Sequence, residues 1–248
     1  MFRTRTTVML VFATLAALVA LPATGAAQRR VISTRQDAPS DATTFLGADL
    51  VYAQPQVDFS HYVNQAWGVT GHLIHALDPQ GIISLRAELG YLIYGQRTAR
   101  QPLGGGALGL IDVDVTTSNN IVLGGLGLQL MAPNGTLRPY LTGTLGFSYF
   151  FTESSVAGSG SESFAQSENY SDGGFSSAWG GGLYIPLHAG AQPLSIDIGA
   201  QLHKNGDIQY LTANSISFSG TNASPVIRPI RSAADYVTYR VGFSVGIR

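Results

Sequence analysis

Hydrophobic and polar residues alternate strictly along the stretch of chain from Tyr236 to Ile247. The apolar positions of this segment are Val237, Tyr239, Val241, Phe243, Val245 and Ile247, and the positions between them are Thr238, Arg240, Gly242, Ser244 and Gly246. A period of two predicts a β-strand with two unlike faces. The pattern is typical of a strand that meets lipid on one face and a polar or tightly packed space on the other.

Seven earlier segments show the same alternation, so the sequence predicts eight strands. Their expected ranges are 43–54, 66–77, 82–96, 116–131, 138–152, 176–187, 194–205 and 236–248. In the first of them, Leu46 and Leu50 lie on the apolar side, whereas Gly47 and Asp49 lie on the other.

The connections between these segments alternate in length. Short turns with Pro or Gly are expected at 78–81, 132–135 and 188–193. Long loops are expected at 55–65, 97–115, 153–175 and 206–235. This alternation predicts an all-β fold, an eight-stranded antiparallel up-and-down transmembrane β-barrel with short periplasmic turns and long extracellular loops. Because the strand number is even, both chain ends are expected on the periplasmic side.

Aromatic residues gather at the long-loop ends of the predicted strands. They are Tyr52, Trp67, Tyr91, Tyr94, Tyr149, Phe150, Phe151, Trp179, Tyr236 and Tyr239. Amphipathic rings favour the membrane–water interface, so we expect these residues to form an outer aromatic girdle. Tyr140 and Tyr184 are expected near the opposite interface.

A soluble barrel with its apolar face inside is the alternative, because periodicity does not distinguish inside from outside. Two features favour lipid outside. One face of each strand is aliphatic throughout, whereas a soluble barrel needs a polar exterior. The other face is rich in Gly, Ser, Thr, Asp and Arg, which suits the narrow interior of eight strands.

The N-terminal residues are typical of a secretory signal. Arg3 and Arg5 precede an apolar run, and small residues at 24–27 suit cleavage. The sequence therefore predicts a signal peptide at 1–27, a periplasmic arm at 28–42 and a barrel at 43–248, in the outer membrane of a Gram-negative type of envelope. A retained anchor is the alternative, although the apolar run is short for a spanning helix, which needs about 20 residues.

Composition excludes several other classes of protein. The chain contains no Cys, which rules out disulfides and thiolate chemistry. Its formal net charge is −1 and Lys204 is its one lysine, so nucleic-acid binding is not expected. Charged residues make up 12% of the chain and glycine contributes 30 residues, a balance that suits a strongly curved sheet facing lipid.

Charged and polar residues occupy mid-strand positions on the interior face. They are Asp49, His72, Arg86, Glu88, Asp197, His203 and Arg240. In a narrow lumen such charges must be paired, because an isolated buried charge is very costly. We expect Arg240 to reach Asp49 or Asp197, and Arg86 to pair with Glu88. The network is interpreted as a polar plug, with a narrow solute path as the alternative.

Seven glycines on the same face favour the path rather than the plug, because they would leave space. They are Gly47, Gly68, Gly90, Gly180, Gly182, Gly242 and Gly246.

The chain shows no arrangement of residues that predicts catalysis. The five His residues do not combine with a nucleophile and an acid in any recognisable spacing. Asp112 and Asp114, together with acids at 153, 162, 168 and 172, leave a loop Ca²⁺ site as an alternative. We predict a protein that is not an enzyme, with no cofactor and no metal site.

The chain resembles the small outer-membrane β-barrel proteins, the class of the OmpA transmembrane domain, OmpX and OmpW. The resemblance spans residues 43–248 and is carried by residues 138–147 (RPYLTGTLGF), residues 179–187 (WGGGLYIPL) and the closing strand. Arg240, Gly242, Val245 and Ile247 match the spacing of the signal that the barrel-insertion machinery reads in such proteins. The chain departs from that signal by lacking a terminal aromatic residue.

The resemblance implies contacts with outer-membrane lipid and lipopolysaccharide, assembly by the insertion machinery, and a monomer. The interior charges predict a largely occluded lumen, and we expect a structural or surface-interaction role, with the partner of the extracellular loops unknown. The alternative is a narrow channel or conduit for small solutes or small hydrophobic molecules.

Overall fold

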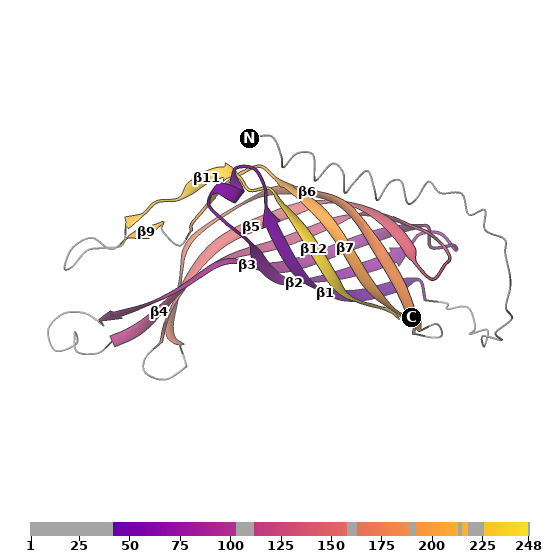
Figure 1. Ribbon diagram of the computed structural model, residues 1–248, viewed down its shortest axis with the longest axis horizontal. Coiled ribbons are helices and arrows are strands. Elements are labelled where there is room, and N and C mark those ends of the chain that lie inside the picture. Colours follow the sequence, from indigo (N-terminus) through magenta and orange to yellow (C-terminus); the bar gives the residue numbers. More distant parts are fainter. Residues whose placement is uncertain are drawn as a thin grey trace. The chain divides into compact units, whose positions relative to one another are not determined.

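Eight long antiparallel strands close into a barrel (Figure 1). The computed structural model describes residues 42–102, 112–157, 163–188, 192–212, 215–217 and 226–247. The barrel strands are β1 (Thr44–Pro55), β2 (Ala66–Ala76), β3 (Ile83–Pro102), β4 (Asp112–Met131), β5 (Arg138–Ala157), β6 (Ser163–His188), β7 (Leu194–Asn205) and β12 (Tyr236–Ile247). Each strand pairs with its sequence neighbour in the barrel, and β12 pairs with β1. The predicted eight-stranded up-and-down barrel is confirmed.

Short elements lie in the connections at the long-loop end. A 3-10 helix, η1 (Phe59–His61), lies between β1 and β2. Between β7 and β12, β8 (Asp207–Tyr210) pairs with β11 (Ile230–Ala233), and β9 (Ile216–Ser217) pairs with β10 (Val226–Ile227). Among the described residues no helix is both long enough and apolar enough to cross a membrane.

The register of β1 and β12, the strands that close the barrel, places the apolar positions of one strand opposite the apolar positions of the other. β1 and β12 pair without a break from Thr44↔Ile247 to Pro55↔Tyr236. Apolar side chains on the outer face are exposed, as Leu50 (67%) and Phe243 (56%) show. Asp49, on the inner face, is only 3% exposed. The predicted assignment of inner and outer faces is therefore correct.

Strands β3 to β6 are longer than the sequence predicted. Much of the expected loops 97–115 and 153–175 forms paired strands, with pairs as far out as Pro102↔Asp112 and Ala157↔Ser163. β2 begins at Ala66 and β7 ends at Asn205, so this four-stranded extension projects beyond its neighbours (Figure 1). Over most of this extension, Ser, Thr and Asn occupy both faces. The hydrophobic periodicity therefore does not predict these parts of the strands.

The predicted tight turn after β2 is stabilised by one side chain. The carboxylate of Asp78 accepts backbone N–H groups from Ile83 (2.6 Å), Ile82 (3.1 Å) and Gln80 (3.1 Å). These donors hold the pKa of Asp78 below its ordinary value, because they stabilise the charged form. Gly81 adopts φ +66°, a conformation that favours glycine.

The predicted aromatic girdle is partly wrong. Trp67, Tyr91, Trp179 and Tyr239 are exposed on the outer face, as expected. Tyr94, Phe150 and Tyr236 instead point inward and are buried, because they lie on the inner positions of their strands. Tyr140 and Tyr184, expected at the opposite girdle, are also buried inside the barrel.

The predicted signal peptide (1–27) and nearly all of the predicted periplasmic arm (28–42) lie outside the described residues. These two segments remain predictions. The described part of the arm is Ala42, which precedes β1.

Candidate functional site

All seven predicted interior residues lie on the inner face of the barrel and are buried. Their exposed fractions range from 0% for Arg86 and Asp197 to 8% for Glu88. They come from β1, β2, β3, β7 and β12, and the curvature of the sheet brings them together across the lumen. The residues are Asp49, His72, Arg86, Glu88, Asp197, His203 and Arg240.

One part of this network is centred on Glu88. Arg86 Nε lies 3.2 Å from Glu88 Oε2, so the expected pairing of neighbours two apart on β3 is present. Arg86 also donates from Nη1 to Gln129 Oε1 (2.9 Å). Thr144, on β5, donates to Glu88 Oε1 (2.8 Å). Both oxygens of the carboxylate are thus engaged by buried side chains.

Arg240 joins Glu88 to Asp197. Its Nη1 lies 3.9 Å from Glu88 Oε2, and its Nε lies 3.8 Å from Asp197 Oδ2. Nη1 donates to Gln201 (2.6 Å) and Nη2 donates to the hydroxyl of Tyr140 (2.9 Å). Of the two partners expected for Arg240, Asp197 is the one that the structure supports, because Asp49 is paired elsewhere.

Asp49 pairs with His72. Its Oδ2 lies 2.9 Å from His72 Nδ1 and also accepts the hydroxyl of Thr70 (3.2 Å). The other ring nitrogen, Nε2, lies 3.2 Å from the hydroxyl of Tyr184. The imidazole is therefore fixed between a carboxylate on β1 and a phenol on β6.

His203 lies nearer the long-loop end. Its Nε2 lies 3.1 Å from the hydroxyl of Thr238, and its ring stacks on Tyr236 with centroids 4.7 Å apart. It therefore contributes more packing than ion pairing to the interior.

Two tyrosines belong to the network although the sequence analysis assigned them elsewhere. Tyr140 donates to Asp197 Oδ1 (2.7 Å), and Tyr184 contacts His72. Strand parity could have identified them, because each lies two or four residues from other interior positions. Tyrosine near a strand end was instead interpreted as part of a girdle.

The interior glycines accommodate neighbouring side chains. A Cβ at Gly47 would collide with the ring of His72, and one at Gly182 would meet the hydroxyl of Tyr140. At Gly68 and Gly180 a Cβ would meet backbone carbonyl groups of the next strand. These glycines therefore make room for the large polar residues and for close strand packing, rather than for a path.

Apolar residues close both ends of the polar network. At the long-loop end, Phe59 of η1 packs edge-on against Tyr210 (5.1 Å between centroids), Tyr94 and Phe150 (5.9 Å each). At the opposite end, a second cluster contains Ile74, Met131, Tyr140 and Tyr184, with Phe45 packed against it. The first loop therefore folds into the barrel mouth instead of extending away from it.

The loop acids considered as Ca²⁺ ligands are not brought together in the described part of the chain. Asp172 accepts the backbone N–H of Gln209 (2.7 Å), and Glu168 accepts the hydroxyl of Tyr149 (3.2 Å). Glu162 lies outside the described residues, as does the side chain of Asp112. Where the structure is described, the one group of three potential metal ligands is Asp49, His72 and Asp197.

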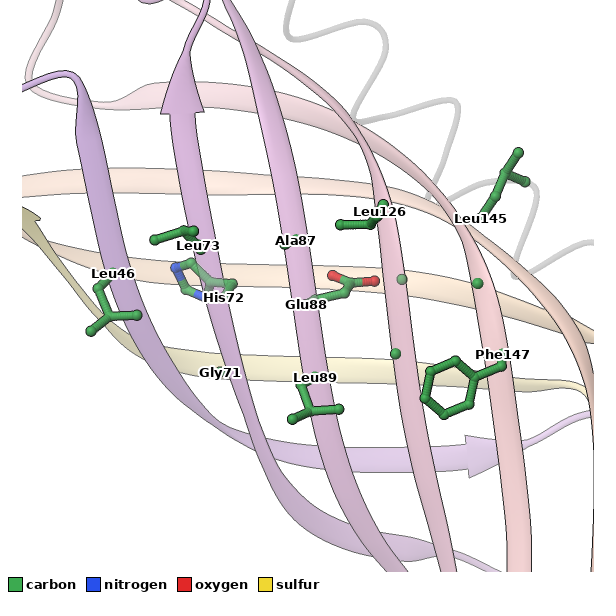
Figure 2. A pocket seen from close by; sticks show the side chains of 13 residues that line it. Leu46, Gly71, His72, Leu73, Ala87, Glu88, Leu89, Leu126, Leu145 and Phe147 are labelled. Carbon is green, nitrogen blue, oxygen red and sulfur yellow. The ribbon is translucent and has the colours of Figure 1, made fainter.

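The outer wall carries an apolar hollow of about 600 Å³ over β1 to β5 (Figure 2). Its floor contains Gly71, and its rim is formed by side chains such as Leu46, Leu89 and Phe147. Phe147 lies over Gly124, its direct partner across β4 and β5, so an aromatic ring covers a glycine on the outer face. Figure 2 also shows His72 and Glu88 behind the wall, on the lumen side of their strands.

The residues of the predicted assembly signal are divided between the two faces. Arg240 and Gly242 point inward, whereas Val245 and Ile247 are on the outer face with 36% and 39% exposure. The role of these four residues in insertion stays a prediction.

Comparison with known proteins gives similarity in structure alone. No family profile and no curated protein sequence matches the chain. Neisserial surface protein A matches 83% of this chain and 98% of its own length, with 10% identity and a TM-score of 0.47. The eight-stranded antiparallel barrel itself is established by the pairing of its strands.

Two further solved structures resemble this barrel. The attachment invasion locus protein Ail of Yersinia pestis matches 83% of this chain and 99% of its own length, with 12% identity and a TM-score of 0.41. A major outer membrane protein of Thermus thermophilus matches 82% of this chain and 99% of its own, with 10% identity and a TM-score of 0.41.

Proposed function

We propose that this chain is an integral outer-membrane barrel with a closed interior and a structural or surface-interaction role. The observation that carries the proposal is the inverted distribution of polarity. Aliphatic side chains are exposed all round the wall, whereas the ion-paired charges are buried inside. A soluble protein instead buries its aliphatic side chains and exposes its charged ones.

The exposed wall supports the membrane location. Leu50, Leu89, Leu126 and Leu145 are between 60% and 67% exposed, and they lie on four different strands. Soluble monomers rarely expose a contiguous apolar surface beyond a few hundred Å². The hollow beside Leu126 suits lipid acyl chains, since it is apolar and open to the outer face. A soluble barrel would need a polar exterior, so the exposed apolar wall is evidence against that alternative.

The interior supports the occluded state. Arg240 reaches across the lumen from β12 to Glu88 on β3 and Tyr140 on β5. The glycines that would widen a path lie against neighbouring side chains or backbone carbonyl groups. Aromatic and aliphatic clusters cover both ends of the network. These features weigh against the narrow-conduit alternative.

The long-loop end supports a surface-interaction role. The β3–β6 extension and the β8–β11 hairpin present polar side chains, and loops positioned by a rigid scaffold commonly bind partners.

We further propose that the protein is a monomer in contact with lipid and lipopolysaccharide. The barrel-insertion machinery assembles it, and it has no enzymatic activity. The burial of the carboxylates and imidazoles beneath packed side chains supports the proposed absence of enzymatic activity.

Conductance in a planar lipid bilayer tests the closed interior. The mature protein is refolded in detergent, its heat-modifiable migration is checked, and currents are recorded at several voltages. We expect a silent membrane for the unmodified barrel. Discrete, reproducible openings whose size changes in the Arg86→Ala variant would identify a conduit and contradict the proposal. The Arg231→Ala variant is the matched control, because Arg231 is exposed and lies outside the barrel lumen.

A further inference from the structure

Three side chains that commonly ligate metals meet inside the barrel. Asp49 of β1, His72 of β2 and Asp197 of β7 place one ligand atom each within 4.8 Å of one another. All three residues are buried, with exposed fractions of 3%, 2% and 0%. Three strands that are not all adjacent therefore contribute to a single compact set of donors.

The register of the closing strands creates this arrangement. Asp49 lies opposite Gly242 on β12, and Gly242 lies opposite Asp197 on β7. The two carboxylates thus stand on one rung with a glycine between them. A Cβ at Gly242 would collide with Oδ1 of Asp49. Asp49 therefore leans over the glycine towards Asp197, an approach that any larger residue would block.

Two carboxylate oxygens in the cluster have no hydrogen-bond donor among the described residues. They are Oδ1 of Asp49 and Oδ2 of Asp197. Leaving a buried polar atom unsatisfied costs about 1–3 kcal/mol, and more for a charged group. Oδ2 of Asp197 faces Arg240 Nε at 3.8 Å, which is too long for a hydrogen bond. Two buried anionic oxygens thus remain available to a cation.

The charge balance of the interior points the same way. Asp49, Glu88 and Asp197 contribute three carboxylates, whereas Arg86 and Arg240 contribute two guanidinium groups. Arg86 approaches Glu88, and Arg240 lies between Glu88 and Asp197, so Asp49 is the carboxylate that neither arginine pairs with among the described contacts. This surplus of one negative charge favours a cation beside Asp49 and Asp197.

The surrounding hydrogen bonds hold the donors in orientations that suit a metal. Tyr184 lies 3.2 Å from His72 Nε2 and Asp49 lies 2.9 Å from Nδ1, so the ring is held on both sides; with the proton on Nε2, donating to the phenol, Nδ1 carries the lone pair that a metal ion between it and Asp49 would bind. Tyr140 donates to Oδ1 of Asp197 and leaves Oδ2 free. Metal-binding histidines and carboxylates typically have such outer partners.

We propose that Asp49, His72 and Asp197 bind a divalent transition-metal ion, with Zn²⁺ the best fit. One imidazole nitrogen and two carboxylate oxygens suit zinc, whereas Ca²⁺ and Mg²⁺ favour oxygen ligands alone. Zinc–ligand distances of about 2.0–2.2 Å place tetrahedral donors roughly 3.3–3.6 Å apart, and the three donor atoms, which lie within 4.8 Å of one another, reach that spacing by small side-chain adjustments. The ion ties β1 and β2 to β7 across β12, and so reinforces the pair of strands at which the barrel closes.

The test measures zinc retained by the untagged full barrel. The protein is refolded in detergent with Zn²⁺ or with EDTA, passed through a desalting column and analysed for zinc by elemental emission. We expect about one zinc per chain after refolding with the ion and a raised temperature of heat-modification. Because apolar clusters cover both ends of the lumen, zinc added after folding is expected to enter far more slowly than zinc present during folding.

Variants separate this site from adventitious binding. Asp49→Asn, His72→Gln and Asp197→Asn are each expected to lose the retained zinc, and Tyr184→Phe to weaken binding by about 10-fold or more. Asp207→Asn and His75→Gln are controls that keep it, the first an exposed acid on β8 outside the cluster and the second an exposed histidine.

Two results would overturn the proposal. One is a heat-modifiable, folded wild-type barrel that retains no zinc above the EDTA sample. The other is equal retention by the three ligand variants, which means an adventitious ion only. If a ligand variant fails to fold, Co²⁺ refolded into the wild type keeps the question decidable. Its visible absorption reports coordination by nitrogen and oxygen, and featureless spectra contradict the site.

Discussion

At the scale of single residues, the interior is held by a few charged side chains with several partners each. Arg240 is 6% exposed and contacts Glu88, Asp197, Gln201 and Tyr140. Removing one member of a buried ion pair leaves the other charge uncompensated in a medium that solvates it poorly. The consequence is that the stability of the barrel depends strongly on individual interior residues.

Replacing Arg240 with alanine is expected to lower the free energy of unfolding by about 3–5 kcal/mol, because Asp197 then lacks its guanidinium partner. Urea unfolding of the refolded barrel in lipid vesicles, followed by tryptophan fluorescence, measures the change. Arg231→Ala is the control, since Arg231 forms an exposed pair with Asp207 and is expected to cost about 1 kcal/mol or less. Equal urea resistance of Arg240→Ala and wild type would contradict the interior network.

At the scale of elements, the first loop acts as part of the barrel interior. η1 places Phe59, which is 1% exposed, among Tyr94, Phe150 and Tyr210. This cluster joins the loop to strands β3 and β5 and to β8 of the last connection. Its aromatic rings account for the inward positions that the sequence analysis assigned to the outer girdle.

Phe59→Ala is expected to destabilise the barrel by about 3–5 kcal/mol and to expose the first loop to protease, because the cavity left in the cluster is not refilled. Limited proteolysis of the refolded protein, with the cleavage site identified by mass spectrometry, measures the second effect. Tyr62→Ala is the matched control, since Tyr62 follows η1 but is 52% exposed. A loop that stays as resistant in Phe59→Ala as in Tyr62→Ala would show that the cluster does not anchor it.

The extension of β3 to β6 shows a limit of pattern reading at the element scale. Its strands are joined by the backbone ladder and by side-chain pairs such as Thr98 with Thr116 (2.9 Å) and Thr117 with Ser154 (3.0 Å). Apart from the short alternation at residues 112–115, polar residues occupy both faces, so the pattern does not mark the strands. Alternation reports contact with lipid or with the core, and it ends where that contact ends, although the hydrogen-bonded sheet continues.

At the scale of the whole molecule, the wall is matched to a nonpolar solvent. The outer face is aliphatic from strand to strand, and its hollow over β1 to β5 is lined largely by leucine and glycine. The same surface in water would favour aggregation, whereas in a bilayer it contacts lipid acyl chains, which are also apolar. The proposed membrane location thus follows from the outer face of the complete barrel and not from a single strand.

Leu126→Arg tests this location. In a bilayer the charge is expected to cost about 2–4 kcal/mol of unfolding free energy, because it lies on the lipid-facing wall. Leu137→Arg is the control, since Leu137 is similarly exposed (55% against 64%) but lies in the turn before β5. Urea titration of both variants in lipid vesicles gives the comparison. Equal, small effects would indicate that the wall does not face hydrocarbon.

Eight strands, their up-and-down order and the charged residues of their inner faces could be predicted from the amino-acid sequence, whereas the inward-facing tyrosines and Phe150 were not. Alternation is a local property, because successive side chains of a strand point to opposite sides. The seven interior residues could therefore be named before the fold was known, and Arg86 could be paired with Glu88 because both lie on one strand.

Contacts across the lumen could be identified only in the folded barrel. The rung that joins Asp49, Gly242 and Asp197 depends on the register at which β12 pairs with its two neighbours. The inward turn of Phe59 and the contact of Tyr184 with His72 depend on curvature and closure. Local periodicity carries no information about register or closure, because these are set by the hydrogen bonds and packing of strands distant in the chain.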